Sequence, residues 1–88
     1  MFQTKTKKEN ILHRLKIVRG HMNKVILMVE NDDYCIDTLF QIKAIGKALH
    51  EAERVILEQH LETCLVSQIQ TGKSQKAIEE MKKVLTQL

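Results

Sequence analysis

The sequence contains no proline, no tryptophan and only three glycines, and its aromatic residues make up 3% of the chain. Because proline is the strongest helix breaker, its absence permits long uninterrupted helices. So few aromatic rings argue against a protein that binds single-stranded nucleic acid by stacking bases on them. No apolar run approaches the roughly 18 residues of a transmembrane helix, and the first residues lack the apolar core of a signal peptide. We therefore expect a cytoplasmic protein that does not bind membranes.

The chain has 88 residues, which is enough for one small domain. We expect residues 1–88 to form that domain, with residues 1–9 as a basic, flexible arm. A chain of this size buries only a modest part of its surface by itself. Association between copies is therefore the expected source of additional stability.

The spacing of apolar residues predicts three helices and no strand. A first helix carries a seam with alternating intervals of four and three residues, formed by Ile11, Leu15, Val18, Met22, Val25 and Val29. Turn-forming side chains at residues 31–33 end it. A second helix spans about residues 34–65, and a short third helix follows a loop at residues 70–74. The predicted fold class is all-α, an antiparallel helical hairpin plus a short third helix.

Soft metal ligands lie at both ends of the second predicted helix. His60 and Cys64 are four residues apart, so they share a helical face and can hold one ion. Cys35 lies roughly 35–40 Å from His60 along a continuous helix, which rises about 1.5 Å per residue. The two ends can meet across an antiparallel pair of chains. The sequence therefore predicts a dimer with two sites, each formed by Cys35 of one chain and by His60 and Cys64 of the other.

Two thiolates and one imidazole favour Cu(I), with Zn(II) as the usual competitor. Structural zinc sites prefer four ligands, whereas three ligands suit the low coordination number of Cu(I). The reduced thiols of the cytoplasm also argue against a structural disulfide. On spacing alone, two buried structural cysteines and a surface histidine are an equal alternative.

Charge is unevenly distributed along the chain. Residues 1–24 carry seven basic side chains and one acidic side chain, whereas residues 25–88 carry seven basic and ten acidic ones. A basic first third of this kind fits a polyanionic partner, although any single lysine is more often simply solvated. The charge distribution favours phosphate contacts, and the family resemblance described below implies that the polyanion is double-stranded DNA. The candidate phosphate contacts are Lys7, Lys8, Arg14, Lys16, Arg19, Lys24, Lys43 and Lys47.

Several motifs occur together in residues 11–65: Arg14-Leu15-Lys16 with Gly20-His21, Tyr34-Cys35-Ile36-Asp37, Gln41-Ile42, Ala44-Ile45, Ala48-Leu49, and Glu58-Gln59-His60-Leu61 through Cys64. With these motifs the chain resembles the copper-sensing operon repressor (CsoR) family of small all-helical bacterial regulators. The Cys-His-Cys set is the signature of its Cu(I)-sensing branch. The resemblance implies that Cys35, His60 and Cys64 are Cu(I) ligands.

The same resemblance implies an outer pair, Tyr34 and Glu80, that forms hydrogen bonds around the ligating histidine, as metal-bound histidines generally require. It further implies a homotetramer of two dimers that binds operator DNA without metal and releases it when Cu(I) binds. The first helix departs from the family pattern at Ile17, Arg19 and His21, where a cation, an acid and a glutamine are usual. These departures shift the positions at which DNA contacts are expected.

Two other functions fit parts of the sequence. A persulfide-sensing repressor of the same fold would use Cys35 and Cys64 but would not need His60. A copper-buffering protein would use all three ligands and leave the basic N-terminal third without a role. An enzyme is not expected, because the sequence has no P-loop, dinucleotide fingerprint or set of nucleophile, base and orienting group.

Overall fold

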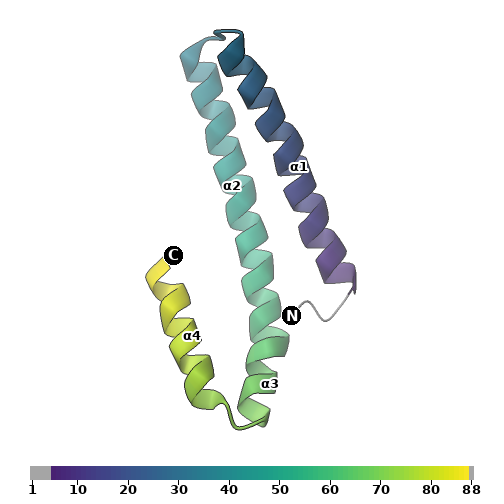
Figure 1. Ribbon diagram of the computed structural model, residues 1–88, viewed down its shortest axis with the longest axis vertical. Coiled ribbons are helices and arrows are strands. Elements are labelled where there is room, and N and C mark those ends of the chain that lie inside the picture. Colours follow the sequence, from purple (N-terminus) through teal and green to yellow (C-terminus); the bar gives the residue numbers. More distant parts are fainter. Residues whose placement is uncertain (1–4, 88) are drawn as a thin grey trace. The chain divides into compact units, whose positions relative to one another are not determined.

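The computed structural model describes residues 5–87, which form helices joined by two short turns (Figure 1). The elements are α1 (Lys5–Glu30), α2 (Cys35–Gln59), a π-helical turn (His60–Cys64, below the π-turn), α3 (Leu65–Gln70) and α4 (Ser74–Gln87). The predicted all-α fold class is confirmed. The chain divides into two compact units, a hairpin unit up to Ile56 and a C-terminal unit from Leu57 onward.

The hairpin unit consists of α1 and the first part of α2, which run antiparallel (Figure 1). The predicted turn at residues 31–33 is confirmed. Asp32 has a φ of 55°. The N–H of Asp33 donates to the carbonyl of Met28 at 2.9 Å, and the N–H of Asp32 donates to the carbonyl of Val29 at 3.1 Å. This pair of bonds with a left-handed residue between them is a Schellman motif, which ends α1 and reverses the chain.

The core of the hairpin unit is narrow. Val18 and Val25 of α1 pack with Ile45 of α2, and Ala48 lies against them. Beside this cluster, the His21 Nε2 and the Gln41 Oε1 lie 2.6 Å apart in a half-buried hydrogen bond between the two helices. The hydrogen bond fixes the helices' register at a point where neither side chain is apolar.

The predicted seam of α1 is only half correct. Ile11, Val18 and Val25 are buried as expected. Leu15, Met22 and Val29 are 41–60% exposed, while Lys7, Arg14 and His21 are half-buried in their place. The buried stripe is thus displaced around the helix, because α2 covers one edge of a wide apolar face rather than its centre. The other edge is left exposed in the single chain.

The beginning of α1 also differs from the prediction. The helix begins at Lys5, so residues 5–9 of the predicted flexible arm are helical, while residues 1–4 of that arm lie outside the described residues.

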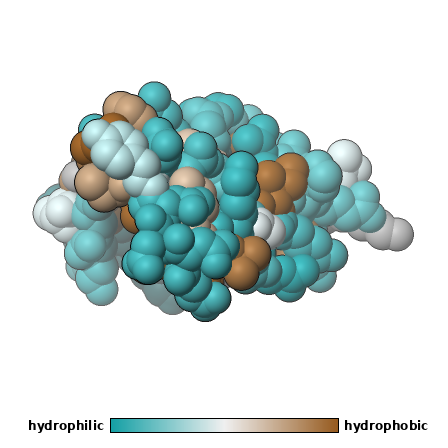
Figure 2. All heavy atoms as spheres, turned by 90° about the horizontal axis from the view of Figure 1, so that it is seen from above, coloured by the Kyte–Doolittle hydropathy of each residue, from teal (hydrophilic) through white to brown (hydrophobic). Residues whose placement is uncertain are grey.

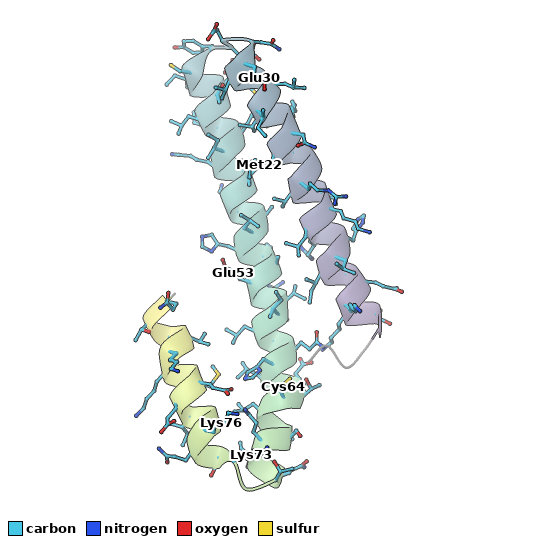
Figure 3. All side chains as sticks on the ribbon, viewed as in Figure 1. Met22, Glu30, Glu53, Cys64, Lys73 and Lys76 are labelled. Carbon is cyan, nitrogen blue, oxygen red and sulfur yellow. The ribbon has the colours of Figure 1, made fainter. Side chains whose placement is uncertain are left out.

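In the C-terminal unit, the predicted second helix does not end at residue 65. It continues through the π-turn and α3 to Gln70. Gly72, with a φ of 78°, then forms a second Schellman motif, in which the N–H of Lys73 donates to the carbonyl of Gln68 at 2.7 Å. The chain turns back into α4, which packs on α3 through the buried Ala77. Figure 3 marks Lys73 in this turn and Lys76 near the beginning of α4.

Many large apolar side chains lie at the surface of the single chain. They include Ile17, Leu27, Phe40 and Ile42 in the hairpin unit and Ile69, Ile78 and Leu85 in the C-terminal unit, all more than half exposed. Figure 2 shows such apolar side chains among hydrophilic ones. Across residues 5–87, no helix has both the length and the apolar character needed to cross a membrane.

Candidate metal centre and basic surface

The two ligand candidates of the C-terminal unit bracket the π-turn. His60 is its first residue and Cys64 its last, and the N–H of Leu65 donates to the carbonyl of His60. Both side chains are half-buried, and Figure 3 marks Cys64 where α2 passes into α3. A π-turn closes i→i+5 bonds and holds more residues per turn than the 3.6 of an α-helix. His60 and Cys64 therefore lie one above the other, close to a single turn apart.

The hydroxyl of Thr63 lies between the backbone of the π-turn and the sulfur of Cys64. Its Oγ1 donates to the carbonyl of Gln59 at 2.7 Å and lies 3.7 Å from the Cys64 Sγ. The sequence analysis did not single out Thr63. The available signal was a hydroxyl residue directly before a candidate ligand, at the spacing that allows a bond to the carbonyl four residues earlier.

The third ligand candidate belongs to the hairpin unit. Cys35 is the first residue of α2 and is exposed. Tyr34 precedes it, is 67% exposed, and accepts the N–H of Thr38 at its carbonyl at 3.2 Å. Among residues 5–87 of one chain, no three His, Cys, Asp or Glu side chains come close enough to hold a metal ion. Cys35 lies in a different unit from His60 and Cys64, and their joint role as ligands stays a prediction.

Glu80 of α4 is half-buried and accepts a hydrogen bond from Nε2 of Gln68 at 3.1 Å. The bond joins α3 to α4 inside the C-terminal unit. The predicted role of Glu80 and Tyr34 around His60 stays a prediction, and Gln68 is the partner that Glu80 has in this structure. Gln68 was not identified from the sequence, because a glutamine on a short helix carries no distinctive signal.

Gln59, directly before His60, is the most deeply buried large side chain of the C-terminal unit. It is 1% exposed, and neither its Nε2 nor its Oε1 has a hydrogen-bond partner within residues 5–87. Buried polar atoms in this condition are uncommon and destabilising. The buried amide of Gln59 is therefore unfavourable for stability at the position directly before the ligand pair.

The predicted DNA contacts differ in accessibility. Lys8, Lys16, Arg19, Lys24, Lys43 and Lys47 are exposed. Lys7 and Arg14 are half-buried, and the Nε of Arg14 donates to the Oδ1 of Asn10 at 2.8 Å. The exposed six can reach a phosphate without rearrangement, whereas Arg14 is held by Asn10 through its Nε and would contact a phosphate through its terminal nitrogens.

Glu51 of α2 reduces the positive charge of the basic residues near it. The guanidinium of Arg54 donates to the Glu51 carboxylate at 3.0 and 3.2 Å. This hydrogen bond, the charge of Arg54 and then the charge of Arg14 hold the pKa of Glu51 below its usual value. Glu51 is therefore ionised near neutral pH and offsets part of the charge of Arg14.

Residues 7–87 match the family model described as a metal-sensitive transcriptional repressor. The chain belongs to this family. It is 47% identical over 75 residues to a copper-sensing transcriptional repressor CsoR of Mycobacterium bovis, which covers 85% of this chain and 63% of that relative. It is 38% identical over 74 residues to the CsoR of Bacillus subtilis, which covers 84% of this chain and 73% of the relative. The chain thus spans less than two thirds of the mycobacterial relative.

A solved member of the metal-sensitive repressor family has the same fold. The copper-sensing repressor CsoR with Cu(I) from Geobacillus thermodenitrificans superposes with a TM-score of 0.92 at 38% identity, covering 99% of this chain and 91% of that one. The resemblance found in the sequence is therefore confirmed at the level of family and fold. A family of transcriptional repressors also agrees with the expectation that the chain is not an enzyme.

Proposed function

We propose that this protein is a Cu(I)-responsive transcriptional repressor of the cytoplasm. The observation that carries the proposal is the pairing of an imidazole and a thiol, His60 and Cys64, at the two ends of one π-turn. Relatives that cover most of this chain are named copper-sensing repressors, and a structural relative was solved with Cu(I). Two sulfurs and one nitrogen form the soft ligand set that Cu(I) prefers.

Cys35, His60 and Cys64 would hold the ion between two copies of the chain. Cys35 is exposed at the start of α2 and so is accessible to another copy. His60 and Cys64, both half-buried at the ends of the π-turn, would supply the other two ligands. Bound Cu(I) would supply a cross-link between the copies, because its ligands come from both.

DNA binding rests on the six exposed basic residues of α1 and α2 named above. We propose that the chain forms a single domain and assembles as a tetramer of two dimers. The tetramer would present several copies of this basic surface to one duplex. Most of the affinity would then come from phosphate contacts and fall steeply with salt. The metal can weaken DNA binding only if it favours a tetramer shape that fits DNA less well.

The proposal is tested by titrating the reduced protein with Cu(I) under anaerobic conditions, in competition with a chromophoric Cu(I) chelator. In parallel, fluorescence anisotropy follows a labelled duplex selected for binding the metal-free protein. We expect one Cu(I) per chain and release of the duplex over the same range. His60→Ala should abolish the response, whereas His50→Ala is a matched control, because His50 is an exposed histidine of α2 that pairs with Glu53. Equal DNA affinity with and without Cu(I) would refute the proposal.

A complementation experiment tests whether the site lies between copies. Cys35→Ser and His60→Ala each remove one ligand, so neither variant alone has an intact site. In a mixed dimer, one site would combine both defects and the other would be complete. Random exchange of chains should therefore restore about one quarter of the sites in a two-fold symmetric dimer. If the mixture binds no more Cu(I) than the separate variants, the site is not shared between copies.

A further inference from the structure

Thr63 stands out among the side chains that the proposed site does not use. Its hydroxyl has one proton and two candidate acceptors, the Gln59 carbonyl at 2.7 Å and the Cys64 sulfur at 3.7 Å. A hydroxyl can donate only one hydrogen bond at a time. The oxygen–oxygen distance is the usual one for an O–H···O hydrogen bond, so the carbonyl is the better-placed acceptor in this structure.

We propose that Thr63 is a positioning residue for Cys64, which it holds in the ligating orientation through the backbone of the π-turn. The inference rests on the proposed function and adds a residue to the same site. By bonding the carbonyl of Gln59, Thr63 ties its own side chain to the preceding turn. Because Cys64 is the next residue and its sulfur lies beside Oγ1, the same bond restricts where the sulfur can lie.

The second acceptor gives the hydroxyl a further role. When the sulfur of Cys64 ligates a metal ion it is a thiolate, and hydrogen bonds to ionised acceptors are stronger than those to neutral ones. The proton of Thr63 then gains a competing acceptor in Sγ. Donation to the sulfur would stabilise the ligated thiolate and release the Gln59 carbonyl. Metal binding is thereby linked to a backbone hydrogen bond of the π-turn.

The chain contains a matched control in Thr71. Its Oγ1 donates to the carbonyl of Ser67 at 2.9 Å, which is the same bond to the residue four positions earlier. Thr71 follows the last residue of α3 and is exposed, and its hydroxyl donates to the backbone carbonyls of Ser67 or Gln68 rather than to sulfur. A substitution at Thr71 therefore removes the backbone bond without touching a ligand.

The test compares the Cu(I) affinities of the full-length wild type, Thr63→Val, Thr63→Ser and Thr71→Val by chelator competition. We expect Thr63→Val to weaken Cu(I) binding by about 10- to 100-fold, the usual effect of losing a partner of a metal ligand. Thr63→Ser keeps the hydroxyl and should bind nearly as wild type, and Thr71→Val should be unchanged. The DNA affinity of the metal-free protein should stay the same in all four, which a general structural defect would not permit.

Wild-type affinity in Thr63→Val would overturn the proposal. So would an equal loss in Thr63→Ser, because the hydroxyl would then not be the group responsible, or an equal loss in Thr71→Val. The proposed function fails in a different way, by an absence of tight Cu(I) binding or of DNA release in the wild type itself. Far-UV circular dichroism identifies any variant that has lost its helices. If Thr63→Val is such a variant, Thr63→Ser alone decides the test: retained Cu(I) affinity supports the proposal, and lost affinity overturns it.

Discussion

Replacing Gln59 with Met is expected to make the protein more stable. The Gln59 side chain is 1% exposed, and both of its polar atoms lack a hydrogen-bond partner within residues 5–87. A buried polar group without a partner costs about 1–3 kcal/mol. Methionine is unbranched and flexible, favours helices and carries no strong polar atom. We therefore expect the free energy of unfolding to rise by about 2 kcal/mol, which corresponds to about 8–16 °C in Tm for a domain of this size.

The assay is urea unfolding followed by far-UV circular dichroism under reducing conditions, at several protein concentrations because association contributes to stability. The control is Gln75→Met on the exposed part of α4, which should change the free energy by less than about 0.5 kcal/mol. A Gln59→Met protein that is less stable than the wild type would refute the reasoning. It would mean that the amide forms hydrogen bonds in the assembled protein, and that the substitution removes them.

Three further predictions follow from the helices and turns. Gly20→Ala should stabilise α1 by up to about 1 kcal/mol, because a Cβ there meets nothing within 4 Å. Gly72→Ala should instead destabilise the turn before α4 by about 1–2 kcal/mol, because the φ of Gly72 is 78°. Thermal melts of the pair should shift in opposite directions, and two shifts of the same sign would contradict this assignment. Ile45→Ala should cost about 2–5 kcal/mol, since Ile45 is 4% exposed in the hairpin core; an effect under 1 kcal/mol in urea unfolding would show that this core is not formed. Arg54→Ala should raise the pKa of Glu51 toward its ordinary value, as measured by NMR titration. The lowered pKa stabilises the folded state above the unfolded pKa, and this contribution is lost as the pH falls through the folded value.

The sequence was sufficient for the features that depend on local chemistry. Helical periodicity and the polar residues at 31–33 predicted the hairpin, because a Schellman motif needs a residue such as Asp32 that tolerates the left-handed conformation. The ligand types of His60 and Cys64 and their spacing predicted a shared face. These features involve interactions between residues that are near one another in the chain.

The predictions that were wrong concern features that depend on tertiary packing. The apolar face of α1 is wider than one helix can cover, so periodicity could not decide that Val18 would be buried while Leu15 would be exposed. The π-turn was missed because residues 59–65 contain no breaker and are compatible with an ordinary α-helix. The predicted metal site is a different case: it stays a prediction, because Cys35 belongs to a different unit from the other two ligands and the site requires two copies of the chain.

The π-turn also has a consequence for chain length. A π-turn amounts to one residue inserted into an α-helix, and its wider turn accommodates that extra residue. Deleting one residue between His60 and Cys64 would therefore restore an ordinary helical turn and leave α3 in nearly its present orientation relative to residues 57–59. The hydrogen bond from Gln68 to Glu80 lies entirely after the deletion and would be kept, whereas His60 and Cys64 would then be three residues apart instead of four. A sequence one residue shorter here should thus keep the fold of the C-terminal unit and change only the spacing of the ligand pair, so the length of this segment bears on the ligands rather than on the fold.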